Sequence, residues 1–417
     1  MPGAGAAEPR LNIVTRTNSS TSSQRSTLIL CVAAALFEGF DNQSMGVAAP
    51  RLIPEFALTA VQTSWVFTAA TIGLFIGAVV GGRLSDLIGR RQVLIGSMLV
   101  MGVCSLWTAM AGDLTTLVLA RFMTGLGLGG AMPNFIALSA EAVEPSQRVR
   151  TVTAVTAALP LGGALAGLIA LSQGLLGWDW RVIFYVGGLG PIVLALVMIP
   201  VLRESRVIER AAASATAGAP VPAMSTALFG DGRASTTLQL WLGFFFAQMV
   251  LLLMLNWLPT LFVGLHFSQA QASWASILFN VSGAFVGMLL ARKCVGAERR
   301  MWIMLTYGGI AVSLLLLPTA STFAVAAIAC ALAGATIIGA QLILYASAPL
   351  YYDKVIRGTG VGAAVGIGRL GSVFGPLYGG VVLAFAGAST AVLIGTIPFV
   401  LIGGGATLAL ARQPHAA

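Results

Sequence analysis

Residues 82–91 read Gly82-Arg83-Leu84-Ser85-Asp86-Leu87-Ile88-Gly89-Arg90-Arg91, and they separate two apolar runs at 62–82 and 92–111. Each run holds about 20 residues, which as a helix rising ~1.5 Å per residue cross a hydrocarbon core ~30 Å thick. Glycine permits a tight turn, and arginines between spans collect on the cytoplasmic side of a membrane. The stretch therefore predicts two transmembrane helices joined by a short cytoplasmic turn.

The same pattern continues along the chain. Hydrophobic residues make up 57% and charged residues 9% of the sequence, against roughly a quarter charged in soluble domains, and the mean hydropathy is +0.91. The segments 28–36 and 323–333 are apolar on every face, whereas transmembrane strands would alternate. We therefore predict an all-α membrane protein with twelve transmembrane helices. The predicted spans are 28–50, 62–82, 92–111, 115–139, 150–172, 181–201, 238–262, 272–291, 301–318, 322–347, 358–385 and 388–410.

The basic residues predict the orientation. With both termini in the cytoplasm, the inside segments hold nearly all of the 23 basic residues and the outside loops hold only Arg51 and Arg181. Arg121 and Arg369 fall within spans. We expect a multi-pass protein of the inner membrane, with the lipid bilayer as a partner. The formal charge of +9 does not indicate nucleic acid, because the basic residues punctuate the apolar runs and form no single stripe.

The two halves of the chain repeat each other at a spacing of 209 residues. Trp65 matches Trp274, Gln62 matches Gln271, and the same shift relates residues 90–91 to 299–300. Such a repeat predicts two six-helix bundles related by a pseudo-twofold axis along the membrane normal. The predicted divisions are a cytoplasmic tail at 1–27, which we expect to be disordered, bundles at 28–202 and 237–411, a cytoplasmic linker at 203–236 and a second cytoplasmic tail at 412–417.

Several residues on the predicted cytoplasmic side are candidates for a gate between the bundles. Residues 82–91 closely resemble the signature loop of the major facilitator superfamily, in which Asp86 would cap a helix start and pair with arginines. Glu141 and Arg148 resemble the second cytoplasmic charge pair of that family. An ordinary positive-inside turn is the alternative. The predicted gate residues are Gly82, Asp86, Gly89, Arg90, Arg91, Glu141 and Arg148.

Two carboxylates lie within the first predicted span. Glu38 and Asp41 are three residues apart and so near one helix face. An acidic residue at a span centre costs roughly 2.5 to 3.5 kcal/mol, so it is rarely kept unless it lines a cavity or meets a partner. We predict that Glu38 and Asp41 couple transport to protons. The alternative is that Asp41 only forms a structural pair with an arginine.

The two arginines within spans are candidate anion sites. Arg121 opens a glycine-rich segment, 121–130, that resembles a fourth-helix motif of the same superfamily. A guanidinium there can hold an anionic substrate through two hydrogen bonds or stabilise deprotonated Asp41. Arg369 offers a second positive charge from the other bundle. Its alternative role is to extend toward the cytoplasmic surface.

Polar and aromatic residues of the second half suit an aromatic ring that carries hydroxyl groups. The candidates are Asn256 and Trp257 in the seventh span and Gln341 and Tyr345 in the tenth. Taken singly, each is more often a packing residue than a ligand contact.

The chain as a whole resembles the aromatic acid:proton symporter family. The resemblance rests on the segment 38–41 (Glu-Gly-Phe-Asp), on residues 82–91 and on the stretch from Gly358 to Pro376. Segments 129–138, 256–259 and 345–352 are similar to those of 3-(3-hydroxyphenyl)propionate transporters. The resemblance implies uptake of a hydroxylated aromatic carboxylate together with protons, by alternating access. Family members usually carry aspartate at both acidic positions, so Glu38 departs from the pattern and leaves open which carboxylate carries the proton.

Other classes of function fit the sequence less well. A drug efflux antiporter is the nearest alternative, but residues 159–163 match the glycine-proline motif of such exporters only in part. An enzyme is excluded for want of a nucleophile, base and metal constellation, so we expect no catalytic residues. With His266 and His415 alone and four scattered cysteines, which we interpret as packing residues, we expect no metal site and no cofactor. We expect the protein to act as a monomer.

Overall fold

The computed structural model describes residues 13–202, 224–230, 232–294, 298–353 and 356–413, and within these ranges every regular element is a helix. The first half contains α1 (Ile13–Glu55), α2 (Ala60–Ile88), α3 (Arg90–Ala109), α4 (Leu114–Glu141), α5 (Arg148–Thr156), α6 (Ala158–Leu176) and α7 (Arg181–Val201). The second half contains α9 (Met224–Phe229), α10 (Ala234–Gly264), α11 (Gln269–Ser282), η1 (Gly283–Gly287), α12 (Met288–Lys293), α13 (Arg299–Thr319), α14 (Phe323–Ser347), η2 (Ala348–Tyr351), α15 (Arg357–Ala386), α16 (Ser389–Gly395) and α17 (Ile397–Leu410).

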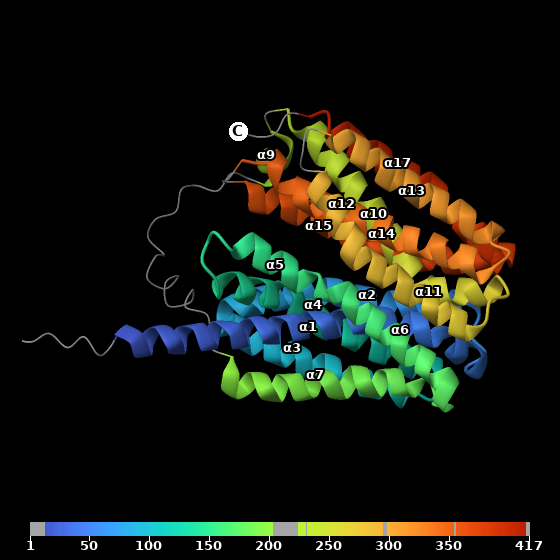
Figure 1. The fold of residues 1–417 in the computed structure, drawn as a ribbon, viewed down its shortest axis with the longest axis horizontal. Helices are drawn as coiled ribbons and strands as arrows, with labels where there is room; N and C mark the ends of the chain where they lie inside the picture. Colours follow the sequence, from blue (N-terminus) through green and yellow to red (C-terminus); the bar gives the residue numbers. More distant parts are fainter. Residues whose placement is uncertain (1–12, 203–223, 231, 295–297, 354–355, 414–417) are drawn as a thin grey trace, which may run out of the picture.

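The helices form two bundles, one from each half of the chain (Figure 1). Helices α1 to α7 lie on one side and α9 to α17 on the other, and α2 packs against α15 and α6 against α11 where the bundles meet. Eleven helical segments of the described residues are long and apolar enough to cross a membrane. The remaining long helix, α1, holds residues 38–43 with two acids, an asparagine and a glutamine, which lower its hydropathy. The predicted all-α membrane fold is confirmed.

All long helices begin or end at one of two opposite ends of the molecule. We call the end that holds the α2–α3 turn at Gly89 the Arg90 end, and the end that holds the α1–α2 turn near Ala57 the Arg51 end. Among the described basic residues at helix ends, only Arg51 and Arg181 lie at the Arg51 end. The charge asymmetry inferred from the sequence therefore corresponds to two physical ends of the bundle pair.

The helix boundaries differ from the predicted spans in several places. Because α1 begins at Ile13, the expectation of a disordered segment at 1–27 is wrong for residues 13–27, while residues 1–12 lie outside the described part. The predicted span 150–172 breaks at Ala157, since Pro160 removes a backbone donor and crowds the preceding turn. The last span breaks at Thr396, just before Pro398, for the same reason. Most of the predicted linker, and residues 414–417, lie outside the described residues.

The repeat of 209 residues appears in atomic detail. Thr59 caps α2 and Ser268 caps α11, each in a reciprocal capping box with the glutamine three residues later. A Cβ atom placed on Gly162 would lie 1.9 Å from the Leu36 carbonyl oxygen, and one on the equivalent Gly371 would lie 2.0 Å from that of Phe245. Both halves therefore bring the same helix pair into backbone contact through glycine.

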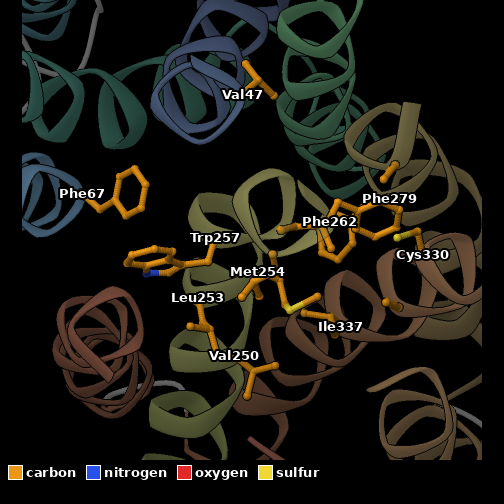
Figure 2. Close-up of a cluster of buried hydrophobic side chains, with 14 of the residues drawn as sticks. Val47, Phe67, Val250, Leu253, Met254, Trp257, Phe262, Phe279, Cys330 and Ile337 are labelled. Atoms are coloured by element: carbon orange, nitrogen blue, oxygen red, sulfur yellow. The ribbon is translucent and has the colours of Figure 1, made fainter. Parts of the chain in front are cut away.

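Of the three apolar clusters among the described residues, one contains side chains of both bundles. One buried cluster combines residues of both halves, and in it the rings of Phe67 and Trp257 meet edge to face with centroids 5.1 Å apart (Figure 2). Cys330 packs in this cluster, as its interpretation as a packing residue predicts. The other two clusters each belong to one half, within residues 30–202 and 227–410 respectively. The shared contacts near Phe67 lie toward the Arg51 end, so the bundles are packed together there.

Candidate functional site

Asp41 on α1 and Arg121 on α4 form a buried ion pair in the first bundle. Arg121 Nη1 donates to Asp41 Oδ1 and Nη2 donates to Oδ2, each at 3.0 Å. Their side chains are 1% and 3% exposed, so the pair is almost fully shielded from solvent. A bidentate pair of this kind satisfies both terminal nitrogens of the guanidinium. The structural pairing considered from the sequence is therefore formed.

The surroundings of the pair hold it in place. The Arg121 guanidinium lies over the Phe184 ring at 5.8 Å, and α4 approaches α2 closely because Gly125 lies directly against the Ala70 carbonyl. Arg121 Nε is buried without a hydrogen-bond partner among the described residues. Neutralising Asp41 would therefore leave the Arg121 charge buried without its partner and so weaken the contact between α1 and α4.

Glu38 and Arg369 bring charge from both bundles to the same region. Glu38 is 2% exposed, its Oε2 has no hydrogen-bond partner among the described residues, and both Arg369 and Asp41 act on it electrostatically. Arg369 Nη2 contacts Met132 Sδ of the opposite bundle at 3.2 Å. Within the described chain Arg369 forms no ion pair. It reaches across to the first bundle and does not extend toward the surface.

A second polar contact between the bundles was not predicted from the sequence. Gln43, half a turn beyond Asp41, donates from Nε2 to the Leu255 carbonyl at 2.9 Å and accepts from Asn280 Nδ2 at 3.0 Å. Gly46 lies against the same Leu255 carbonyl. The polar composition of residues 41–44 was the available signal, but the partners on α10 and α11 depend on how the bundles dock.

The four predicted ring-contacting residues have different environments. Trp257 is 1% exposed and donates from Nε1 to the Pro376 carbonyl at 2.9 Å, so it is a packing residue here. Asn256 donates to the Leu252 carbonyl of its own helix. Tyr345 packs edge to face on Phe244 at 5.3 Å. Gln341 is buried with neither amide atom hydrogen-bonded to a described residue, which is an unusual state for a buried amide.

The predicted gate residues are partly brought together at the Arg90 end. Arg90 forms an ion pair with Glu141, which joins the start of α3 to the end of α4. Arg91 Nη2 donates to the Ile199 carbonyl in the last turn of α7 at 2.5 Å. In the second half, Arg299 donates to the Ala411 carbonyl at the end of α17. Both halves therefore use an arginine of this loop to bind the end of their sixth span.

The other four predicted gate residues form no contact between the bundles among the described residues. Asp86 lies exposed in the last turn of α2, so it caps no helix start, and within the described chain it forms no ion pair. Gly89 holds the turn itself with φ 104°, a conformation that side chains rarely adopt. Arg148 begins α5 and is exposed, and Glu141 pairs with Arg90 instead of with it. The predicted Glu141–Arg148 pair is therefore not formed in this conformation: Arg90 pairs with Glu141, and Arg148 is exposed at the start of α5. Around Gly82 a Cβ atom would meet nothing.

The Arg51 end carries a hydrogen-bond network that the sequence did not reveal. Arg51 Nε donates to Gln269 Oε1 of the opposite bundle at 3.0 Å, and its Nη1 donates to Gln173. Nearby, Glu55 accepts from Trp180 Nε1 at 2.5 Å and pairs with Arg181 at 2.8 Å within the first bundle. The sequence carries only an indirect signal: Arg51 and Arg181 are the two basic residues outside the spans that do not lie on the predicted cytoplasmic side.

The described residues offer no group of three or more metal-ligating side chains. The candidate site is a charged and polar region with residues from both bundles. It combines one closed ion pair, one acid with an unpartnered oxygen and one arginine that reaches across the interface.

Comparison with known proteins shows the family and the fold of the chain. A family model described as Major Facilitator Superfamily matches residues 31–376. The chain is 41% identical over 393 residues to the 3-(3-hydroxy-phenyl)propionate transporter of Escherichia coli (strain K12). The matched region covers 94% of this chain and 95% of that protein. It is 33% identical to a gallate transporter of Pseudomonas putida, with 86% and 85% coverage. In fold it is similar to a partially occluded inward open xylose transporter of E. coli, with TM-score 0.75, 15% identity and coverage of 95% and 99%.

Proposed function

This chain belongs to the Major Facilitator Superfamily, and we propose that it takes up an aromatic carboxylic acid together with protons across the inner membrane. The favoured substrate is 3-(3-hydroxyphenyl)propionate or a related hydroxylated aromatic acid, because relatives that cover most of the chain are named as carriers of such acids. The observation that supports the proposal is the buried ion pair of Asp41 and Arg121, together with Arg369, which forms no ion pair among the described residues.

We assign the Arg90 end to the cytoplasm, with both termini on that side. The support is the concentration of described basic residues at that end. The bundles, at 28–202 and 237–411, then touch at the outer side through Arg51, Gln269 and the Phe67–Trp257 contact. In this assignment the bundles are in contact on the outer side, and alternating access requires these outer contacts to break.

Asp41 is the proposed proton carrier. When Asp41 is charged, both terminal nitrogens of Arg121 hold it. A proton on the carboxylate removes one charge of the pair and leaves Arg121 buried without its counter-ion, which is costly. Protonation therefore favours a different packing of α1 against α4, and release of the proton restores the pair. This links the position of the first bundle to the proton gradient.

Arg369 is the proposed site for the carboxylate of the substrate. Arg121 already donates from both terminal nitrogens to Asp41, whereas Arg369 contacts the Met132 sulfur and forms no ion pair among the described residues. An anion moving into a negative cell needs at least one accompanying proton to cancel its charge. A carboxylate on Arg369 and a proton on Asp41 would meet that requirement with residues from both bundles.

Uptake of labelled 3-(3-hydroxyphenyl)propionate into right-side-out membrane vesicles tests the proposal. We expect acidification of the outside medium to raise accumulation, and a protonophore to abolish it. The rival, a proton-driven efflux antiporter of small aromatic compounds, gives the opposite sign, because an inward proton gradient would then lower the label inside. Competition by a panel of aromatic acids identifies the substrate.

A further inference from the structure

Two glutamine side chains of the second bundle are buried with unpartnered amide atoms. Gln248 on α10 and Gln341 on α14 are each 6% exposed. Gln248 Oε1 and both amide atoms of Gln341 have no hydrogen-bond partner among the described residues. Buried amides are nearly always hydrogen-bonded, so these three atoms are suited to a ligand.

The two glutamines lie at neighbouring heights on facing helices. The rings of Phe244 on α10 and Tyr345 on α14 are in contact, with centroids 5.3 Å apart. Helix α10 runs toward the Arg51 end and α14 runs away from it. Gln248 lies four residues after Phe244 and Gln341 four residues before Tyr345, so both lie one helical turn farther toward the Arg51 end, on the same faces. The Phe244–Tyr345 contact therefore places the two glutamines at the same level on adjoining helices.

The repeat explains why Gln248 fits where it does. In the first bundle the equivalent position is Gly39, whose Cβ would lie 1.8 Å from the Leu159 carbonyl. In the second bundle the glycine is on the other helix of the pair: Gly368 occupies the position equivalent to Leu159. A Cβ on Gly368 would lie 3.3 Å from Gln248 Cγ. The glycine on α15 makes room for the glutamine, immediately before Arg369.

The repeat also indicates which way position 341 faces. Its equivalent in the first bundle is Met132, 209 residues earlier, and Met132 contacts Arg369 of the opposite bundle. Because the bundles are related by a pseudo-twofold axis, position 341 faces the first bundle in the same manner. Gln341 therefore belongs to the surface between the bundles, as Arg369 does.

We propose that Gln248 and Gln341 form a subsite for a hydroxyl group on the aromatic ring of the substrate, a proposal that rests on the proposed function above. A phenolic hydroxyl both donates and accepts, as a pair of amides requires. It would donate to Gln248 Oε1 and accept from the Gln341 amide, while the carboxylate of the same molecule meets Arg369 nearby. Hydroxylated acids would then be selected over acids with a bare ring, because the latter leave the amides unpaired.

The test compares two substrates that differ by this one hydroxyl. Full-length protein in proteoliposomes with an imposed proton gradient takes up labelled 3-(3-hydroxyphenyl)propionate or labelled 3-phenylpropionate. Gln248→Met and Gln341→Met keep the length of the side chain and remove its amide. We expect each to lower the ratio of the two kcat/KM values about tenfold, as for loss of one buried hydrogen bond. Gln239→Met should leave the ratio unchanged: Gln239 Oε1 also lacks a partner among the described residues, but its side chain is only half-buried, its Nε2 is bound to Ser235, and it lies in the second turn of α10, near the Arg90 end.

The ratio does not depend on how much active protein is present, so partial misfolding of a variant does not disturb it. Where a methionine variant transports neither acid, Gln248→Asn and Gln341→Asn take its place, with a smaller fall expected. An equal loss for both acids would overturn the subsite and leave proton-coupled uptake standing. Failure of the unsubstituted protein to accumulate either acid would overturn the proposed function and the subsite with it.

Discussion

Arg121 donates one hydrogen bond to each carboxylate oxygen of Asp41, both at 3.0 Å, in a part of the first bundle that excludes solvent. Removing one partner of such a pair leaves an uncompensated buried charge, which typically costs about 3–5 kcal/mol. The pair therefore gives a prediction for stability as well as for transport.

For Asp41→Asn we expect loss of proton-driven accumulation and a lower unfolding temperature in detergent. The double variant Asp41→Asn with Arg121→Gln removes both charges, so its unfolding temperature should recover while accumulation stays absent. Thermal unfolding and proteoliposome uptake of the same preparations measure the two effects. Undiminished accumulation in Asp41→Asn would exclude this residue as the proton carrier.

Glu38 gives a contrasting prediction. Glu38 forms no ion pair among the described residues, so neutralising it breaks no direct salt bridge, although it removes the longer-range attraction to Arg369. We expect Glu38→Gln to fold normally and to keep accumulation against a gradient. Uptake of substrate at several outside pH values measures this. If Glu38→Gln loses accumulation while Asp41→Asn keeps it, the proton travels on Glu38 instead.

For Arg369→Ala we expect the KM for the aromatic acid to rise by about ten-fold or more, because a hydrogen bond to a charged group contributes roughly 1.5–3 kcal/mol. Arg369→Lys keeps the charge and should restore part of the affinity, since lysine cannot bind a carboxylate through two parallel hydrogen bonds. Initial uptake rates over a range of substrate concentrations measure KM. Equal KM values in Arg369→Ala and the unsubstituted protein would remove Arg369 from the substrate site.

The sequence was sufficient for much of the fold and for less of the site. Apolar runs fix which segments cross the membrane, because the cost of unsatisfied polar groups in lipid does not depend on tertiary detail. The prediction of Asp41, Arg121 and Arg369 as site residues followed from the same cost. The contacts of Gln43 with Asn280 and of Arg51 with Gln269 did not, since they join residues more than 200 positions apart and depend on how the bundles dock. Glu141 was identified, but its partner depends on the direction of α5.

The glycines at the close helix contacts give a prediction about folding. Gly162→Ala and Gly371→Ala each place a Cβ atom about 2 Å from a backbone carbonyl oxygen. Backbone must shift to relieve this, so we expect lower unfolding temperatures, with overpacking costs of about 1–3 kcal/mol. Gly96→Ala and Gly366→Ala, where a Cβ meets nothing, should be neutral or slightly stabilising. Equal changes in unfolding temperature for the close-contact glycines and for Gly96 and Gly366 would mean that the close helix contacts do not contribute to stability.

The contact between Arg51 and Gln269 predicts a shift between conformations. We expect Arg51→Ala to favour molecules whose bundles are separated at the Arg51 end. The ratio of separated to closed molecules should rise about two- to ten-fold, as for loss of one net hydrogen bond. Spin labels at Ala57 and Ala270, in a background with the four cysteines replaced by serine, report the distance. Arg181→Ala is the control, because its partners Glu55 and Asp179 lie in its own bundle. The same shift in both variants, or no shift in Arg51→Ala, would contradict the inference that the Arg51–Gln269 contact holds the two bundles together.

The reciprocal capping boxes at Thr59 and Ser268 have a consequence for biosynthesis. Each is completed by a glutamine three residues later, so the start of the helix is specified by a few consecutive residues and needs nothing from the other half of the chain. A growing polypeptide can therefore fix the start of its second membrane-spanning helix soon after these residues leave the ribosome. The signal recurs when the second half is made, so each half carries its own instruction for insertion.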